Sequence, residues 1–370
     1  MELTGSKVVT VEKDFDILKH VEAGDFVISM RSFQGGLEYS TKSGAISSAY
    51  VMLVPNLELV YPRFYRWLLK SSVYIDALQR TTNMVRDGQA MRYSNFAQVR
   101  LFILPLDEQK SRADFLDLEC SSIDKILFKT RSSIEEYKKL KQAVITQAVT
   151  KGVRGEREMK DSGVEWIGEI PEEWNKCKLK NISIDIGDGL HGTPKFDDSG
   201  EVYFINGNNF SSEYVEPKFD TKKLCLEESL NYPKPELTEQ TIMISLNGSY
   251  GKVCLYRYFP MLLGKSAGYI TLLPSINRRY VRYYLSSTPA QIIMTLSLNG
   301  TTIPNLSLNT LYNFPTILPP ASEQAEIADY LDTKCAEIDG LIAKKEQLVK
   351  ELESYKKSLI YEVVTGKREG

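Results

Sequence analysis

The sequence has 370 residues and a formal net charge of −2, with 42% hydrophobic, 25% charged and 10% aromatic residues. This composition is typical of a globular protein with two or more domains, and it excludes a globally basic nucleic-acid binder, so any DNA-binding surface must be local or supplied by a partner. No apolar run is long enough to span a bilayer and the N-terminus lacks the features of a secretory signal, so we expect a cytoplasmic protein without membrane contact.

The first hundred residues predict a small mixed domain. Residues 24–30 predict a turn into a short strand, and residues 50–54 predict a second strand. Residues 61–69 have helical spacing with aromatic side chains on one face, which are more often core than base-stacking platforms. Residues 102–105 predict a short apolar strand that ends at a proline.

Two long helices are predicted, over about 107–150 and about 322–365. Neither contains proline, and each would be roughly 65 Å long at 1.5 Å per residue, too long for a compact domain. Both carry a heptad-like apolar stripe. Its members are Leu116, Ile123, Leu127, Ile134, Tyr137, Val144 and Ala148 in the first helix, and Ile327, Leu331, Ile338, Leu341, Leu348, Leu352, Tyr355, Leu359 and Val363 in the second. We expect antiparallel pairing within the chain, with a coiled coil between two chains as the open alternative.

The helices belong to an internal repeat. Residues 108–150 match residues 323–365 without a gap, at a constant separation of 215 residues. The match extends into the globular parts, where the predicted strands 26–29 and 50–54 correspond to 241–245 and 267–273. A repeat of this kind predicts a pseudo-two-fold protein made of two α+β domains, each followed by a long helix, and suggests a two-part target.

The cysteines and histidines predict no metal site. The five cysteines include no Cys-x-x-Cys pair, and the only histidines are His20 and His191. Cys120 and Cys335 occupy the same repeat position, and we expect both to be small buried residues of a reduced protein. Lysines on the helices, such as Lys141 and Lys356, are expected to be solvated or to contact partners.

Between the first helix and the second domain lies a segment with its own motifs. Residues 151–158 are charged and interrupted by glycine, whereas residues 159–174 carry Trp166 and Trp174 and predict an ordered docking strap. A Gly-Asp-Gly-x-His-Gly-Thr-Pro sequence follows at residues 187–194, and a polar loop, Asn-Gly-Thr-Thr-Ile-Pro-Asn-Leu-Ser, occupies residues 299–307.

Together the strap, the opening at 184–194, the loop at 299–307 and the Leu-Pro-Pro before the second helix resemble type I restriction–modification specificity subunits. The resemblance covers nearly the whole chain. It implies an α+β fold in which two target recognition domains are joined by two long antiparallel spacer helices. Each domain would read one half of a split double-stranded DNA sequence. The spacer would set the gap and dock methyltransferase subunits, and restriction (translocase–endonuclease) subunits would join the assembly.

On this basis we expect a first target recognition domain at 1–106, a central spacer helix at 107–151, a linker and docking strap at 152–174, a second recognition domain at 175–320 and a distal spacer helix at 321–366. Compared with the second domain, the first lacks the strap and the opening motif and is expected to be shortened at its N-terminus. A misassigned start, a shuffled specificity cassette and a decayed partial copy all remain open.

The family performs no chemistry itself, and the sequence agrees. It contains no Asn-Pro-Pro-aromatic motif, no glycine-rich methyl-donor loop and no Gly-x-x-x-x-Gly-Lys-Ser/Thr phosphate loop. We therefore expect no catalytic residues and no cofactor. Two other hypotheses stay in view: a coiled-coil adaptor or partial cassette that no longer reads DNA, and a self-sufficient enzyme, which the missing motifs disfavour.

Candidate DNA contacts are polar residues in glycine-containing loops, where the backbone can approach a ligand closely. Lysine and arginine bind phosphates or guanine, and asparagine and glutamine bind adenine; each of these residues could equally belong to an ordinary turn or a solvated surface. The candidates in the first domain are Arg31, Gln34, Arg86, Gln89 and Arg92. Those in the second are His191, Thr193, Lys195, Asn206, Asn208, Asn247, Tyr250, Lys252, Lys265, Asn299 and Thr301. The target sequence and the gap length do not follow from the sequence.

Overall fold

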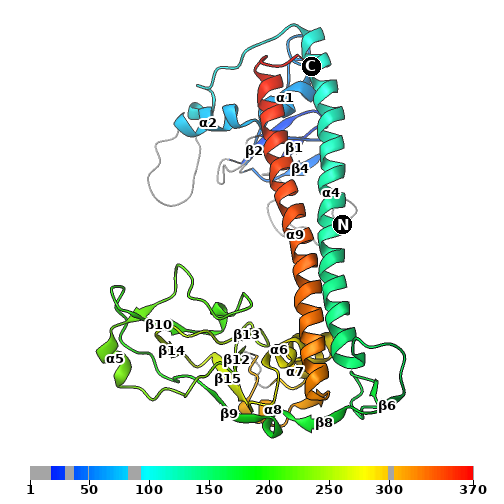
Figure 1. Cartoon of the computed structure of the whole chain (residues 1–370). Helices are drawn as coiled ribbons and strands as arrows, with labels where there is room; N and C mark the ends of the chain where they lie inside the picture. The colour runs from blue at the N-terminus through cyan, green and yellow to red at the C-terminus, as the bar shows by residue number, and fades with distance from the viewer. Residues whose placement is uncertain (1–17, 30–36, 49, 82–92, 299–303, 370) are drawn as a thin grey trace. The chain divides into compact units, whose positions relative to one another are not determined.

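The computed structural model describes residues 18–29, 37–48, 50–81, 93–298 and 304–369. The chain forms two compact units, of which unit 1 comprises residues 1–133 and 344–370 and unit 2 comprises residues 134–343. Both long helices cross this division, so each unit contains a globular domain together with one end of each helix (Figure 1).

Unit 1 is built on a small antiparallel sheet with the strand order β3-β2-β5. Phe26, Ile28, Phe64 and Leu78 belong to the core that packs this sheet against helices. The described elements of its globular part are β1 (Lys19–Val21), β2 (Phe26–Ser29), β3 (Glu38–Tyr39), β4 (Gly44–Ile46), β5 (Tyr50–Leu53), α1 (Pro62–Leu68), α2 (Ser72–Thr81) and α3 (Tyr93–Phe96).

Unit 2 contains a larger set of elements around a four-stranded antiparallel sheet. In chain order they are β6 (Met159–Asp161), β7 (Glu169–Pro171), β8 (Asn175–Lys178), η2 (Leu179–Asn181), β9 (Ser183–Asp188), β10 (Val202–Ile205), η3 (Gly207–Asn209), β11 (Lys223–Leu224), α5 (Leu226–Leu230), β12 (Thr241–Ser245), β13 (Val253–Leu255), β14 (Met261–Leu263), β15 (Ala267–Leu272), α6 (Arg278–Ser286), α7 (Thr288–Leu296), α8 (Leu308–Tyr312) and β16 (Pro315–Leu318).

The central sheet of unit 2 has the order β13-β12-β15-β9. Every residue of β12 and β15 is buried, which agrees with their continuous apolar runs and their places inside the sheet. The hydroxyls of Thr241 and Thr271 lie on paired positions and share a hydrogen bond of 2.9 Å, so the polar atoms of this buried pair are satisfied. A separate three-stranded sheet, β11-β10-β14, extends from this core.

The repeat is visible in the sheets. The β3-β2-β5 sheet of unit 1 corresponds to the β13-β12-β15 part of the sheet in unit 2, and it contains the two pairs of strands that the matched sequences predict. The expected strand over 102–105 is wrong, because residues 101–105 have no strand assignment. In unit 2 the corresponding β16 pairs with β8, and within the described part of unit 1 no strand takes the place of β8.

The two long helices are α4 (Leu106–Lys151) and α9 (Ala321–Val364), within a residue or two of the predicted ends. Asp107 and Glu108 lie in the first turn of α4, where negative charge favours the helix dipole. The helix ends at Lys151 and is followed by Gly152, whose φ of 79° is the left-handed conformation that glycine adopts most readily.

Within each unit α4 and α9 pair in opposite directions. In unit 1, Lys356 Nζ contacts Asp124 at 2.6 Å, and Arg131 forms an ion pair with Glu353. In unit 2, Lys141 forms an ion pair with Asp339. Residues later in α4 therefore pair with residues earlier in α9. The predicted antiparallel pairing within one chain is confirmed.

The apolar stripe of α9 is shifted by one residue in its middle. Leu341, Leu348 and Tyr355 were expected in the stripe, yet their exposed fractions are 41%, 41% and 45%. Val349 packs against the core of unit 1 instead, together with Leu352, which the stripe had predicted correctly. Seven positions after Val349, Lys356 pairs with Asp124 of α4, so the stripe continues there through a lysine that a search for apolar residues passes over.

Cys120 and Cys335 are buried, as the sequence predicts, and burial raises the pKa of the Cys120 thiol to about 11. Across the part of the chain that the structure describes, no helix is long and apolar enough to cross a membrane.

Candidate nucleic-acid interface

Each globular domain is fastened to a long helix by an aspartate at the same repeat position. In unit 1 the Asp117 carboxylate accepts hydrogen bonds from Arg63 Nε at 2.9 Å and from Trp67 Nε1 at 2.7 Å, and Arg66 also contacts it. Burial alone would raise the pKa of Asp117, but these hydrogen bonds outweigh it and hold the pKa below its usual range.

Unit 2 repeats this arrangement with small changes. Asp332 accepts from the Tyr283 hydroxyl at 2.8 Å and pairs with Arg279, which also reaches Asp329 at 2.8 Å. The aromatic residues of α1 and α6 therefore belong mainly to the core and to these attachments: Phe64, Tyr65, Tyr280, Tyr283 and Tyr284 are all buried. Their predicted place in the core is confirmed.

A buried glutamine next to each attachment ties the same helix to the domain. Gln109 accepts from the backbone N–H of Tyr61 at 2.6 Å and donates to the carbonyls of Leu59 and Leu104. Gln324 likewise accepts from the N–H of Asn277 at 2.9 Å and donates to the carbonyl of Pro319. Each globular domain is thus held on its helix end by a buried glutamine as well as by the aspartate, which is the kind of rigid support that a precise binding surface needs.

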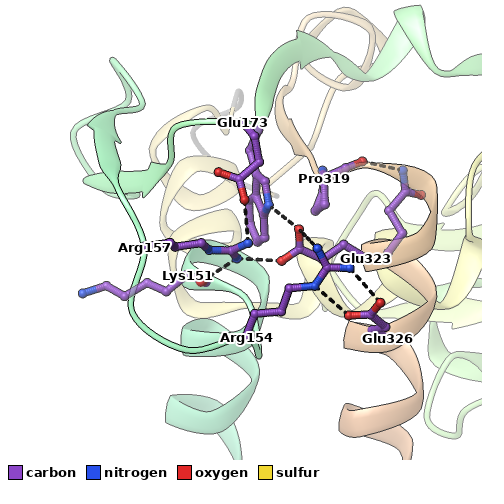
Figure 2. Close-up of polar contacts among 9 residues, drawn as sticks. Lys151, Arg154, Arg157, Glu173, Pro319, Glu323 and Glu326 are labelled. Carbon is purple, nitrogen blue, oxygen red and sulfur yellow. Dashed lines mark hydrogen bonds and ion pairs between the residues drawn. The ribbon is translucent and has the colours of Figure 1, made fainter.

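The strap of unit 2 is anchored on Glu323, whose side chain is fully buried (Figure 2). Its carboxylate accepts from Trp174 Nε1 at 2.9 Å and from Arg157 Nη2 at 2.6 Å. Arg157 also reaches Glu173 and lies over the Trp174 ring. At the rim, Arg154 makes a two-pronged pair with Glu326. The predicted ordered strap is confirmed, because the strap residues are hydrogen-bonded into the domain rather than extended in solvent.

Polar loops from distant parts of the sequence meet at one end of the central sheet in unit 2. The loop after β9 joins the loop after β14 through the Leu190–Gly264 bridge. Gly207 donates its N–H to the Ser266 hydroxyl, and a Cβ on Gly207 would lie only 2.8 Å from Ser245 Cβ. The loop after β12 joins residue 305 through the Asn247–Asn305 bridge. We call residues 189–192, 206–209, 246–252 and 264–266 the loop cluster.

The asparagines of the loop cluster divide into structural and exposed members. Asn206 accepts from the Ser266 hydroxyl at 3.0 Å, and Asn209 donates to Thr221 Oγ1 at 2.8 Å. Asn206 is thus engaged in holding the loop, which weakens its case as a base contact. Asn208 is exposed and Asn247 is half-buried, so both side chains retain a surface that a ligand could reach.

Exposed basic residues accompany the loop cluster. Lys252 and Lys265 are exposed, and His191 is exposed beside Asp188 at 2.7 Å. The backbone of Lys252 is fixed by hydrogen bonds to Ser245 on both sides, so its side chain starts from a rigid base. Tyr250 is half-buried and its hydroxyl lies 3.4 Å from Thr295 Oγ1.

Lys195 and Thr193 belong to a different environment, although both are exposed. The backbone N–H of Lys195 donates to the Glu228 carboxylate at 3.0 Å and thereby lowers the pKa of Glu228. Asp197, Asp198 and Glu227 line the same hollow. Because carboxylates surround it, Lys195 is a weaker candidate for a phosphate contact than Lys252 or Lys265.

Seven of the predicted contacts lie outside the described residues. They are Arg31, Gln34, Arg86, Gln89, Arg92, Asn299 and Thr301. The remaining candidates all belong to unit 2.

Two exposed basic–aromatic pairs were missed by the sequence analysis. Phe219 is fully exposed beside Lys218, and Tyr258 is 83% exposed beside Arg257. Lys222 lies 4.5 Å from the ring centroid of Phe196. The sequence signal that would have identified these pairs is a basic residue directly before an aromatic one. Both pairs lie in turns of the β10-β11-β14 region.

The described residues contain no cluster of His, Cys, Asp and Glu that could hold a metal ion.

A groove of about 1290 Å³ runs beside the loop cluster and is lined by Lys252 and Arg282 among other residues. Glu213, Asp332 and Asp339 line it too and balance the charges of Lys141, Lys252 and Arg282.

A family model described as "Type I restriction modification DNA specificity domain" matches residues 171–351. The MjaVIII type I restriction enzyme specificity subunit of Methanocaldococcus jannaschii is 26% identical over 359 residues, covering 94% of this chain and 80% of that protein. The putative MjaX specificity subunit of the same organism is 24% identical, covering 95% and 78%.

Solved structures show the same fold. A chain from a study of complex assembly and conformational transition in a type I restriction–modification system aligns with a TM-score of 0.73 at 16% identity, covering 94% of this chain and 83% of that chain. The HsdS subunit of Thermoanaerobacter tengcongensis aligns with a TM-score of 0.53 at 16% identity, covering 96% and 84%.

The fold and its repeat define a protein of two α+β domains joined by two long antiparallel helices. The chain matches the specificity-domain family over residues 171–351, and over 94–95% of its length it is similar to type I restriction–modification specificity subunits, which are the non-catalytic components of these systems.

Proposed function

We propose that this chain recognises a bipartite sequence in double-stranded DNA, each unit reading one half. The observation that carries the proposal is the convergence of the loop cluster in unit 2, where Asn208, Asn247, Lys252 and Lys265 present polar and basic groups from a rigid sheet end. Lysines would position the duplex through phosphates, and the asparagines would read base edges in the major groove.

We take residues 1–106 and 175–320 as the two target recognition domains, joined by spacer helices over 107–151 and 321–366, with the linker and docking strap at 152–174. The proposed spacer sets the number of unread base pairs between the half-sites. Rigid attachment through Asp117 and Asp332 supports this role, because a loosely held domain would not fix a gap.

The spacer helices are also the proposed docking surface for methyltransferase subunits, which the restriction subunits would then join. On α4 the apolar side chains of Leu118 and Phe128 are 66% and 75% exposed, and Leu140 is 49% exposed. Large apolar side chains exposed on a long helix are typical of a surface that a partner covers.

The test is to reconstitute the chain with its cognate methyltransferase subunits and to map methylated adenines across a genome. We expect a split motif with a fixed gap of unspecified bases. If the complex assembles but methylates no such motif, the chain is an adaptor or partial cassette and the DNA-reading proposal is wrong.

A further inference from the structure

Arg282 of α6 carries buried N–H groups without a hydrogen-bond partner. Its Nε and Nη1 atoms are both buried, and nothing in the part of the chain that the structure describes accepts a hydrogen bond from them. The guanidinium lies 4.9 Å from the centroid of the Tyr283 ring, a contact that orients the group without supplying an acceptor. A buried N–H that is left unpaired is costly, and more so in a charged group, so such an arginine requires an explanation.

The repeat shows that Arg282 is not needed to attach the domain to its helix. The Tyr65 and Tyr280 hydroxyls donate to matched carbonyls, so α1 and α6 correspond at the repeat separation of 215 residues. At that separation Arg282 corresponds to Trp67, whose indole N–H donates to Asp117. In unit 2 other side chains make the equivalent attachment, so the charge of Arg282 has no part in it.

The acidic side chains that line the same groove leave Arg282 without a counter-charge. Asp332 pairs with Arg279, and Asp339 pairs with a lysine of α4. The third, Glu213, is exposed, and among the described residues none of these carboxylates forms an ion pair with Arg282. One guanidinium in the groove is therefore not neutralised by the chain itself.

The groove that Arg282 lines is larger than a single small ion needs. Its volume is about 1290 Å³, whereas ordinary small-molecule pockets have about 300–1,000 Å³. Ile145, Phe210 and Ile292 give it apolar walls, and several serines and threonines line it as well. All of the lining residues belong to unit 2. The groove has room for several residues of an extended polypeptide with both apolar and polar groups.

One wall of the groove is held in place before any ligand binds. Gln291 of α7 donates to the carbonyls of Gly251 and Leu285, both at 2.8 Å, and so ties this helix to the loop after β12. A Cβ at Gly251 would lie only 2.8 Å from Gln291 Oε1, which is why the loop needs glycine there. A wall fixed in this way lowers the entropy that a ligand loses on binding.

We propose that Arg282 recognises a carboxylate, and that the groove binds an extended segment of a partner polypeptide whose glutamate or aspartate reaches this guanidinium. A guanidinium donates two parallel hydrogen bonds to a carboxylate, which would satisfy N–H groups that are otherwise unpaired. One uncompensated cation matches one singly charged anion. The carboxylates already in the groove would repel the more highly charged inorganic phosphate, and the convex backbone of a DNA duplex does not reach buried atoms. Such binding does not depend on the proposed reading of DNA.

The first test is the stability of the full chain without a ligand. Arg282→Met removes an uncompensated charge and keeps an unbranched side chain, so the unfolding temperature should rise by about 2–4 °C. Arg279→Met is the matched control on the same helix, because Arg279 pairs with two aspartates, and it should lower the unfolding temperature. Scanning calorimetry measures both. An equal loss in the two variants would show that Arg282 is structural and would overturn the proposal.

The second test uses N-acetylglutamate N-methylamide, which mimics a glutamate within a chain. At constant ionic strength it should raise the unfolding temperature in a saturable manner, whereas the glutamine analogue should not. The response should be lost in Arg282→Met. Arg282→Lys keeps the charge without the two-pronged donor, so it should weaken the apparent affinity about tenfold. Absence of a saturable response in the wild-type chain, or a full response in Arg282→Met, would overturn the proposal.

Butyrate, inorganic phosphate and a short DNA duplex distinguish the sources of the anion. A stronger response to the capped glutamate than to butyrate supports a polypeptide, because the groove then contacts the peptide groups as well. A stronger response to butyrate would assign the site to free acids and overturn the polypeptide partner. A response to phosphate or to the duplex that exceeds the response to the capped glutamate and disappears in Arg282→Met would overturn the carboxylate.

Discussion

At the scale of single residues, Glu323 illustrates how a buried charge holds the strap of unit 2. Its carboxylate has no exposed surface, and it is satisfied by an indole N–H and a guanidinium. Removal of one partner from such a cluster leaves the others buried without compensation, which costs more than the pair itself contributes. The exposed pair between Arg154 and Glu326, one helical turn away, has no such consequence.

We therefore expect Glu323→Ala to lower the free energy of unfolding of unit 2 by about 3–5 kcal/mol, because Arg157 and Trp174 lose their acceptor. Glu326→Ala, at an exposed ion pair, should cost less than about 1 kcal/mol. Chemical denaturation followed by tryptophan fluorescence measures both changes, since Trp174 lies within the affected cluster. Equal effects of the two substitutions would contradict the buried anchor.

Asp117 gives unit 1 a pH-dependent attachment. Burial alone would raise its pKa, but hydrogen bonds from Arg63, Trp67 and Arg66 keep the folded pKa below its usual range. A depressed folded pKa contributes stability that is present above the unfolded pKa of about 3.9 and is lost as the pH falls through the folded value. Asp117→Asn should thus cost about 1.5–3 kcal/mol at pH 7 and progressively less in acid.

Unfolding midpoints of the two proteins measured from pH 7 down to pH 2 test this expectation. The control is Asp76→Asn, since Asp76 is exposed within α2 of the same unit. A difference between wild type and Asp117→Asn that persists unchanged at pH 2 would show that the carboxylate charge is not involved.

At the scale of elements, the long helices combine an apolar heptad with two lysines at equivalent repeat positions. Lys141 pairs with Asp339 in unit 2 and Lys356 pairs with Asp124 in unit 1. Lys141 and Lys356 are only 27% and 23% exposed, so both lie partly within the seam between the helices. Polar residues at seam positions specify register at some cost in stability.

Charge exchange tests this register. Lys356→Asp alone should destabilise unit 1, because it places two aspartates together, and the double variant with Asp124→Lys should recover most of the loss. In a double-mutant cycle we expect a coupling of about 0.5–1 kcal/mol for a pair that is partly exposed. Zero coupling, measured by thermal or chemical unfolding, would mean that the pair does not contribute to the register.

The elements also show where sequence alone succeeds. The ends of α4 and α9, the strands β2, β5, β12 and β15 and the burial of the aromatic helices all follow from local patterns. The predicted apolar stripe of α9 is wrong around Leu348, because a lysine occupies one of the positions between the two helices. The prediction of a strand at 102–105 is wrong because a strand needs a pairing partner, which the local sequence does not supply. The convergence of Asn247 with Lys265 depends on sheet topology, which no local pattern encodes.

At the scale of the whole molecule, the repeat produces two units that are built independently. Each has its own core, its own aspartate and glutamine attachments and its own helix pairing. A substitution at the surface of one domain is therefore expected to act on one half-site alone, since distant sites without shared partners behave additively. Loss of both half-sites from one substitution would instead indicate a folding defect.

The candidate contacts in unit 2 provide the corresponding prediction. Lys252→Ala and Lys265→Ala should each weaken DNA binding by the reconstituted complex across all sequences, and each should reduce the slope of log K against log salt by about 1, because one phosphate contact is lost.

Asn247→Ala should instead relax the base preference at one half-site by about 1–3 kcal/mol, while its backbone bridge to Asn305 is retained. Lys195→Ala is the matched control, because carboxylates surround this exposed lysine and its loss should leave the salt slope nearly unchanged. Salt titrations and methylation maps separate these outcomes. The loop cluster would be excluded as the DNA-reading surface if the Asn247 variant changed the half-site assigned to unit 1. It would also be excluded if the salt slope stayed unchanged in both lysine variants.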